Sequence, residues 1–160
     1  MINFIDVEIE GFGSIVKPIK FQLDLGNTLS VIRGDVGSGK TSVPSALCWA
    51  LFGKHLKEKA SIETWDELKP DNFRGTKVVV NFTKGNTRYS VIRCKSFKGK
   101  ITVGKNLKTN GSSNLFFLVD GELEKDSKGK INTQENIEKL LGYSFDLFKN
   151  SIVFGQKMKR

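Results

Sequence analysis

One short segment of this sequence carries the residue types that bind phosphate, and it reads GDVGSGKT from position 34 to position 41. Its three glycines allow the main chain to curl, so that successive N–H groups converge on an anion. The ammonium of Lys40 can then reach the β- and γ-phosphates of a nucleotide, and the hydroxyl of Thr41 can ligate Mg²⁺. The segment therefore predicts a phosphate-binding loop with ATP and Mg²⁺ as cofactors. The predicted cofactor-binding residues are Gly34, Asp35, Val36, Gly37, Ser38, Gly39, Lys40, Thr41 and Ser42.

The segments on either side of the loop support this prediction. Residues 28–32 form a run typical of a strand, and apolar residues recur at helical spacing from Val43 to Leu51, with Gly53 as the stop. Pro44 falls in the first helical turn, where the N–H that it lacks has no helical partner. The alternative is an ordinary Gly/Ser-rich turn, and the strand–loop–helix context favours the phosphate loop over it.

The rest of the chain is typical of a β-rich sheet followed by two helices. Residues 54–75 are polar and predict a mobile loop with a short helix. Thr133 is placed as the cap of a helix that ends at Gly142, Ser144 starts a shorter helix, and residues 151–154 form an extended run. Together these elements predict a single α/β domain over residues 1–160, with a mixed or antiparallel sheet and a strand–helix unit around the loop. Strands are predicted at residues 4–9, 19–23, 77–82, 88–93, 101–103 and 115–119, with Gly85-Asn86 as a hairpin turn.

Composition excludes several classes of protein. The hydrophobic fraction of 38% and the charged fraction of 27% suit a soluble globular domain, and no apolar run is long enough to cross a membrane. The first residues lack the pattern of a secretory signal. Cys48 and Cys94 lie far apart and His55 stands alone, so we expect no metal site built on Cys or His, and a reducing, cytoplasmic location.

Charge is distributed unevenly along the chain. The 26 basic residues outnumber the 17 acidic ones, which gives a net charge of +9. Residues 69–108 contain eleven basic residues and one acidic residue, whereas residues 120–146 contain seven acidic residues and four lysines. This polarity favours a polyanionic partner such as DNA, although a solubilising, lysine-rich surface would give the same composition. The predicted DNA-binding residues are Arg74, Lys77, Lys84, Arg88, Lys95, Lys98 and Lys100.

Several motifs in the right order resemble a known family. The run GFGS at residues 11–14, the phosphate loop and the helix end ALFGK at residues 50–54 are similar to the start of SbcC/Rad-fifty DNA-repair ATPases. The hairpin end YSVIR at residues 89–93, NIEKLLG at residues 136–142 and FKNSIVFGQ at residues 148–156 resemble later parts of the same family. The resemblance covers nearly the whole chain, which makes it more specific than any one motif.

The resemblance implies the N-terminal lobe of an SMC-like ABC-type ATPase head. Gln156 would then be the Q-loop glutamine, a metal ligand together with Thr41 and a catalytic residue together with Lys40. Arg74 resembles the arginine of the SMC-type R-loop. A basic residue common in the family near Gly13 is missing here, and Ser45 replaces a usual acidic residue.

The family also implies parts and partners that these residues do not contain. A coiled coil and a C-terminal lobe with signature, Walker B and switch motifs would follow Arg160, so we expect the chain alone to be inactive. The implied partners are that lobe, a second copy of the head, an SbcD/Mre-eleven-type nuclease and DNA, without a membrane, in the nucleoid or in a phage-infected cell. Three alternatives stay open: a self-contained kinase or GTPase, a nucleic-acid-binding module, and another SMC-like relative of the condensin or RecF type.

Overall fold

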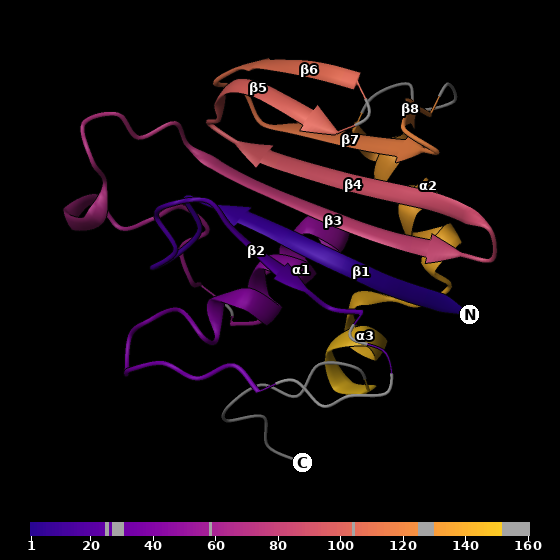
Figure 1. Cartoon of the computed structure of the whole chain (residues 1–160), viewed down its shortest axis with the longest axis horizontal. Coiled ribbons are helices and arrows are strands. Elements are labelled where there is room, and N and C mark those ends of the chain that lie inside the picture. The colour runs from indigo at the N-terminus through magenta and orange to yellow at the C-terminus, as the bar shows by residue number, and fades with distance from the viewer. Residues whose placement is uncertain (25, 27–30, 58, 104, 125–129, 152–160) are drawn as a thin grey trace.

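The computed structural model describes residues 1–24, 26, 31–57, 59–103, 105–124 and 130–151 of the chain. In this part of the chain, a six-stranded sheet has the order β2-β1-β3-β4-β7-β8 (Figure 1). Every pairing in it is antiparallel. Its strands are β1 Ile2–Glu10, β2 Ile19–Gln22, β3 Thr76–Lys84, β4 Thr87–Lys95, β7 Asn114–Val119 and β8 Glu122–Leu123.

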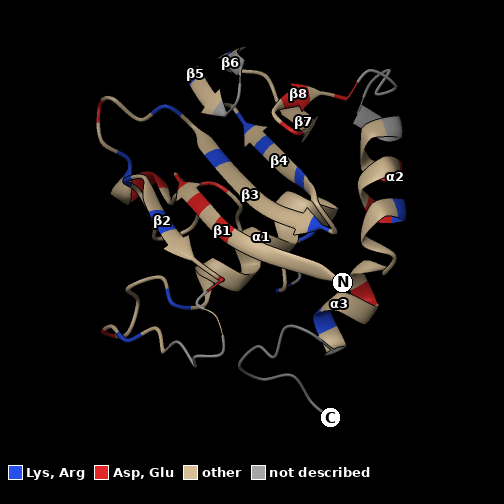
Figure 2. Ribbon diagram, turned by 45° about the vertical axis from the view of Figure 1, so that its right-hand side comes forward, with Lys and Arg blue, Asp and Glu red and all other residues tan. Residues whose placement is uncertain are grey.

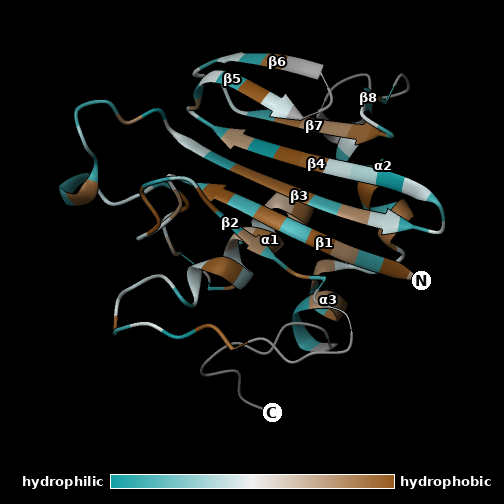
Figure 3. Ribbon diagram, viewed as in Figure 1, coloured by the Kyte–Doolittle hydropathy of each residue, from teal (hydrophilic) through white to brown (hydrophobic). Residues whose placement is uncertain are grey.

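Side chains alternate between the two faces of the sheet, and each face has its own cover. Val78 and Val80 of β3 pack in a cluster with the helices, whereas Val79 between them packs with a small hairpin on the opposite face. Figure 3 shows the apolar residues that the central strands and the first helix contribute. The helices are α1 Ser42–Phe52, α2 Lys130–Leu141 and α3 Phe145–Ser151, the 3-10 turn is η1 Asp66–Leu68, and the small hairpin is β5 Lys98–Val103 with β6 Lys105–Asn110.

Helix α1 and the β3–β4 hairpin agree with the predictions from the sequence. Helix α1 ends where Gly53 takes the left-handed conformation at φ 71° and donates its N–H to the Trp49 carbonyl at 2.8 Å. Strands β3 and β4 form the predicted hairpin, with Gly85 and Asn86 between Lys84 and Thr87. None of the described helices is long and apolar enough to cross a bilayer.

The strand predicted at residues 28–32 is not confirmed. Residues 28–30 lie outside the described residues, and Val31 and Ile32 are in no strand and are 66% and 47% exposed. A strand leading into a phosphate loop needs a neighbouring strand on which to pair and burial on both of its faces. The described sheet, antiparallel throughout, ends at β2 and offers this segment no such place.

Three smaller differences concern the second half of the chain. Thr133 is not a cap: α2 runs from Lys130, and Thr133 is buried inside it. Ser151 belongs to α3 rather than to an extended run, and residues 152–154 lie outside the described residues. Strands β6 and β8 were not predicted, because Leu107 is the only apolar residue of β6 and β8 has only two residues.

Candidate nucleotide-binding site

The phosphate loop is curled around the side chain of its own lysine. Gly37 and Gly39 have φ angles of 86° and 92°, which only glycine adopts without strain. The ammonium of Lys40 donates to the carbonyl oxygens of Gly34 and Asp35 at 2.5 and 2.6 Å. The loop is therefore curled, with a positive charge held across it. The convergence of its main-chain N–H groups on an anion stays a prediction.

Close packing on one side of the loop gives a second reason for glycine at position 39 and a reason for glycine at position 13. A Cβ at Gly39 would lie 3.0 Å from the side-chain atoms of both Ser14 and Ile15. A Cβ at Gly13, whose φ is +56°, would lie 3.1 Å from the Ser42 hydroxyl. The turn after β1 is thus pressed against the first residue of α1, which fixes the loop relative to the sheet.

Helix α1 presents its N-terminal end to the loop without a neutralising acid. The Ser42 N–H donates to the Gly39 carbonyl at 2.9 Å, so the last residues of the loop already turn into the helix. The first turn contains no acidic residue, and the Ser45 hydroxyl donates back to the Thr41 carbonyl at 2.9 Å. The positive end of the helix dipole therefore adds to the charge of Lys40.

The opposite end of α1 is fastened to two other elements. The Arg93 Nε of β4 donates to the Ala50 carbonyl at 3.0 Å, and the Gln134 Nε2 of α2 donates to the Leu51 carbonyl at 2.9 Å. Arg93 also donates to the Gln134 side chain. Burial lowers the pKa of Arg93 to about 10, with Glu138 opposing the shift, so the guanidinium remains charged at neutral pH. These contacts satisfy carbonyls that a helix end leaves without intrahelical partners.

A cleft of about 650 Å³ opens beside the loop. It contains three lysines, Lys40, Lys57 and Lys59, and among the described residues that line it there is no Asp or Glu. An anion is therefore the ligand that its electrostatics favour. The lining residues are Gly13, Ser14, Val36, Gly37, Gly39, Lys40, Thr41, Ser42, Ser45, His55, Lys57, Lys59, Ala60, Ser61 and Trp65.

His55 forms part of the wall of this cleft. Its ring stacks on Phe12 with centroids 5.7 Å apart and planes 6° apart. Burial lowers the pKa of His55; a hydrogen bond to the Lys57 main chain acts in the opposite direction and the Lys57 charge adds to the lowering. Nδ1 of His55 lies 2.9 Å from the Lys57 main-chain nitrogen and 3.1 Å from the Lys57 carbonyl oxygen, so it accepts from the first in one tautomer and donates to the second in the other.

The structure brings the predicted loop residues together but leaves Gln156 untested. Residues 34–42 lie at the N-terminal end of α1, and Gln156 lies outside the described residues, so its role stays a prediction. The Val36 side chain is fully exposed and points away from the protein. Sequence reasoning missed His55, Lys57, Lys59 and Trp65, which lie in the segment predicted only as a polar loop; the one signal was a tryptophan within that polar stretch.

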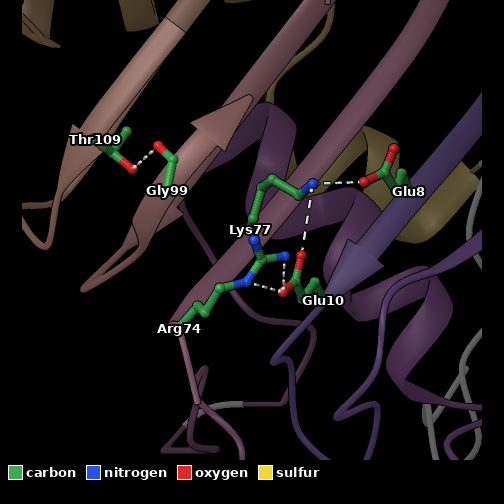
Figure 4. A network of polar contacts seen from close by, with 6 residues as sticks. All are labelled: Glu8, Glu10, Arg74, Lys77, Gly99 and Thr109. Carbon is green, nitrogen blue, oxygen red and sulfur yellow. Dashed lines mark hydrogen bonds and ion pairs between the residues drawn. The ribbon is translucent and has the colours of Figure 1, made fainter. Parts of the chain in front are cut away.

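One predicted DNA contact, Lys77, is mostly buried, and its contact with DNA stays a prediction. Its side chain is only 10% exposed, and its ammonium lies 2.5 Å from a Glu8 oxygen and 3.6 Å from a Glu10 oxygen (Figure 4). Arg74 points toward the same Glu10, to which its Nε and Nη2 donate at 3.1 and 2.6 Å. Both basic residues thus neutralise acids of β1. Figure 2 shows red on β1 beside blue on β3.

The other predicted DNA contacts lie at the surface. Lys84 is exposed and its ammonium donates to the Leu140 carbonyl at 2.7 Å. Arg88 and Lys95 are exposed at the two ends of β4, and Lys98 and Lys100 are exposed on β5. Their contact with DNA stays a prediction.

The chain is similar to known proteins over nearly its whole length. Residues 6–159 match the family described as AAA domain. The SbcC component of the nuclease SbcCD from Staphylococcus aureus strain MRSA252 is 33% identical over 152 residues, covering 94% of this chain and 15% of that protein. The protein of the same name from strain JH9 is 32% identical with the same coverage. The chain therefore spans about 15% of the length of the curated relatives it matches.

Among solved structures, the recombination mediator protein RecF-ATPrS in the RecFOR pathway has a TM-score of 0.45 and 14% sequence identity, covering 85% of this chain and 29% of that one. The match over residues 6–159 and the SbcC relatives agree with the predicted fold class of a P-loop NTPase with an ABC-type head. The chain belongs to the AAA domain family, as an SbcC-like member of it.

Proposed function

We propose that this chain is the ATP-binding N-terminal lobe of an SbcC-like DNA-repair ATPase, in which ATP-driven closure of two heads gates an SbcD/Mre-eleven-type nuclease at DNA ends. The observation that carries the proposal is the curled loop with Lys40 held across it. The loop lies at the edge of a cleft whose described lining includes three lysines and no Asp or Glu. A triphosphate is the ligand class with the charge density to match these groups.

Each residue of the loop has a distinct role in this proposal. The main-chain N–H groups of residues 34–41 bind the phosphates, and Lys40 leaves its two carbonyl partners to donate to them. The Thr41 hydroxyl, exposed at the start of α1, and Gln156 would hold Mg²⁺. That ion neutralises charge on the phosphate oxygens when it is bound. Gln156 would orient the attacking water.

Exposed apolar residues next to the loop support the proposal of a C-terminal lobe as partner. Val31 and Ile32 are exposed, and so is Ile19 on the edge strand β2. Ile19 and Ile32 also line a second cleft of about 430 Å³ on the side of the loop that faces β2. A strand from that lobe would give Val31 and Ile32 a neighbour that the described sheet does not supply. The same assembly would include a second head, in the cytoplasm.

We expect the isolated chain to bind ATP but to hydrolyse it at least about 100-fold more slowly than an ordinary enzyme, whose turnover is about 1–10³ per second. No carboxylate among the described residues lines the cleft, so those residues supply no acidic general base for the attacking water. Calorimetric titration with ATP–Mg²⁺ measures the first property and a phosphate-release assay the second. Turnover at an ordinary rate would instead favour the self-contained kinase or GTPase.

We expect DNA binding by the chain to weaken steeply with salt. Changing Lys98 and Lys100 together to Gln should make the slope of log affinity against log salt less negative by about 1 to 2, because each phosphate contact contributes about 0.9. The control, Lys17→Gln with Lys139→Gln, removes the same charge from residues that are also exposed. Fluorescence anisotropy at several salt concentrations gives the slopes, and equal slopes for the two variants would remove DNA contact from β5.

A further inference from the structure

One aromatic side chain in the cleft is exposed although its main chain is firmly held. The residues just before Trp65 pair with the turn after β1: the Thr64 N–H donates to the Gly11 carbonyl at 3.0 Å, and the Gly13 N–H donates to the Ile62 carbonyl at 3.2 Å. The Trp65 carbonyl accepts from the Leu68 N–H at 2.9 Å. The indole itself is 56% exposed and lines the cleft that contains Lys40 and Thr41.

This anchoring ties the indole to the phosphate loop. Gly13, which holds the segment before Trp65, is the same residue that is pressed against Ser42 at the start of α1. The position of Trp65 relative to Lys40 is therefore set by main-chain contacts and not by a flexible arm. A large apolar surface held in water beside a charged cleft is a feature typical of ligand-binding sites.

We propose that Trp65 stacks on the base of the bound nucleotide and makes the site select purines over pyrimidines. The proposal rests on the proposed function, because the phosphates must first be held at Lys40. The proposal places the base in the cleft that Trp65 lines together with Lys40 and Thr41. One face of the His55 ring is occupied by Phe12, whereas the Trp65 indole is the larger, more exposed π surface.

The same geometry predicts weak discrimination between the two purines. Stacking depends on the area of the rings and tolerates any base with a π face. The other described side chains near Trp65 in this cleft, Lys59 and Ser61, are a cation and a hydroxyl, and neither forms the paired donor and acceptor that would read a base edge. ATP and GTP should bind with similar affinity, and CTP more weakly.

The test compares nucleotides with inorganic tripolyphosphate, which has the phosphates but no base. Trp65→Ala should lower the affinity for ATP–Mg²⁺ about 10-fold and leave the affinity for tripolyphosphate–Mg²⁺ within about 2-fold, whereas Trp65→Phe should retain most of the ATP affinity. In the unchanged chain, ATP should quench the tryptophan fluorescence and tripolyphosphate should not. The second tryptophan, Trp49, is buried in the core and serves as the internal reference.

The outcomes separate the two proposals. ATP affinity unchanged in Trp65→Ala overturns the stacking proposal and leaves phosphate binding intact. Equal losses of ATP and tripolyphosphate affinity overturn it as well, because the substitution would then act on the loop. If the unchanged chain binds neither ligand, the proposed function fails and the stacking proposal fails with it.

Discussion

Lys40→Ala should reduce the affinity of the chain for ATP–Mg²⁺ by about 100-fold or more. The ammonium is lost as a charged donor to the β- and γ-phosphates, and each charge-assisted hydrogen bond is worth about 1.5–3 kcal/mol. In the free chain the same ammonium donates to the Gly34 and Asp35 carbonyls, so it is already held at the loop. Calorimetric titration with ATP–Mg²⁺ measures the change directly.

A matched substitution in the same cleft controls for charge alone. Lys57→Ala removes one positive charge from the cleft lining but not from the loop, and we expect it to weaken ATP binding by only about 3-fold. DNA binding should persist in both variants, which would exclude a nucleic-acid-binding module whose glycine loop contacts DNA. ATP affinity retained in Lys40→Ala would contradict the assignment of the loop.

Gly75→Ala should lower the free energy of unfolding by about 3 kcal/mol or more, the largest stability effect we expect from a single methyl group. Gly75 has a φ of +97°, and a Cβ there would lie 2.3 Å from the Ser96 carbonyl oxygen and 2.6 Å from the Phe97 nitrogen. Both obstacles are main chain, so the cost combines an unfavourable backbone conformation with overpacking that side-chain rotation cannot relieve. Urea unfolding followed by circular dichroism measures it.

Gly85→Ala separates the two causes. Gly85 also has a positive φ, 63°, but no atom lies within 4 Å of the Cβ position. This variant should therefore show only the conformational cost, about 1–2 kcal/mol. If the free energy of unfolding fell by a similar amount in the two variants, the chain around Ser96 would have moved aside, and Gly75 would be required only for its backbone conformation.

Local patterns in the sequence were enough to predict helix α1 and the β3–β4 hairpin, whereas the strand predicted directly before the loop is not confirmed. The glycine spacing, the helix stop at Gly53 and the turn at Gly85 each depend on a few adjacent residues, and the structure has all of them. The family resemblance was likewise confirmed by matches along residues 6–159. The phosphate loop, the helix stop and the turn are each determined by residue types within a window of about ten residues.

Features that depend on distant residues were not predicted. The burial of Lys77 follows from Glu8 and Glu10, which are neighbours only because β1 pairs with β3. The exposure of Val31 was not predicted either. Its apolar side chain favours a strand with a neighbour, and the described sheet does not supply that neighbour. The lining of the cleft by His55 and Trp65 depends on how a polar segment folds back onto the turn after β1.

The hydrogen bonds at the C-terminal end of α1 limit how this helix can move. A helix whose last carbonyls are bonded to Arg93 of β4 and Gln134 of α2 cannot slide along its axis without breaking both contacts. Because packed interiors have low compressibility, a displacement of the N-terminal end of α1 would be transmitted to β4 and α2 through these two contacts.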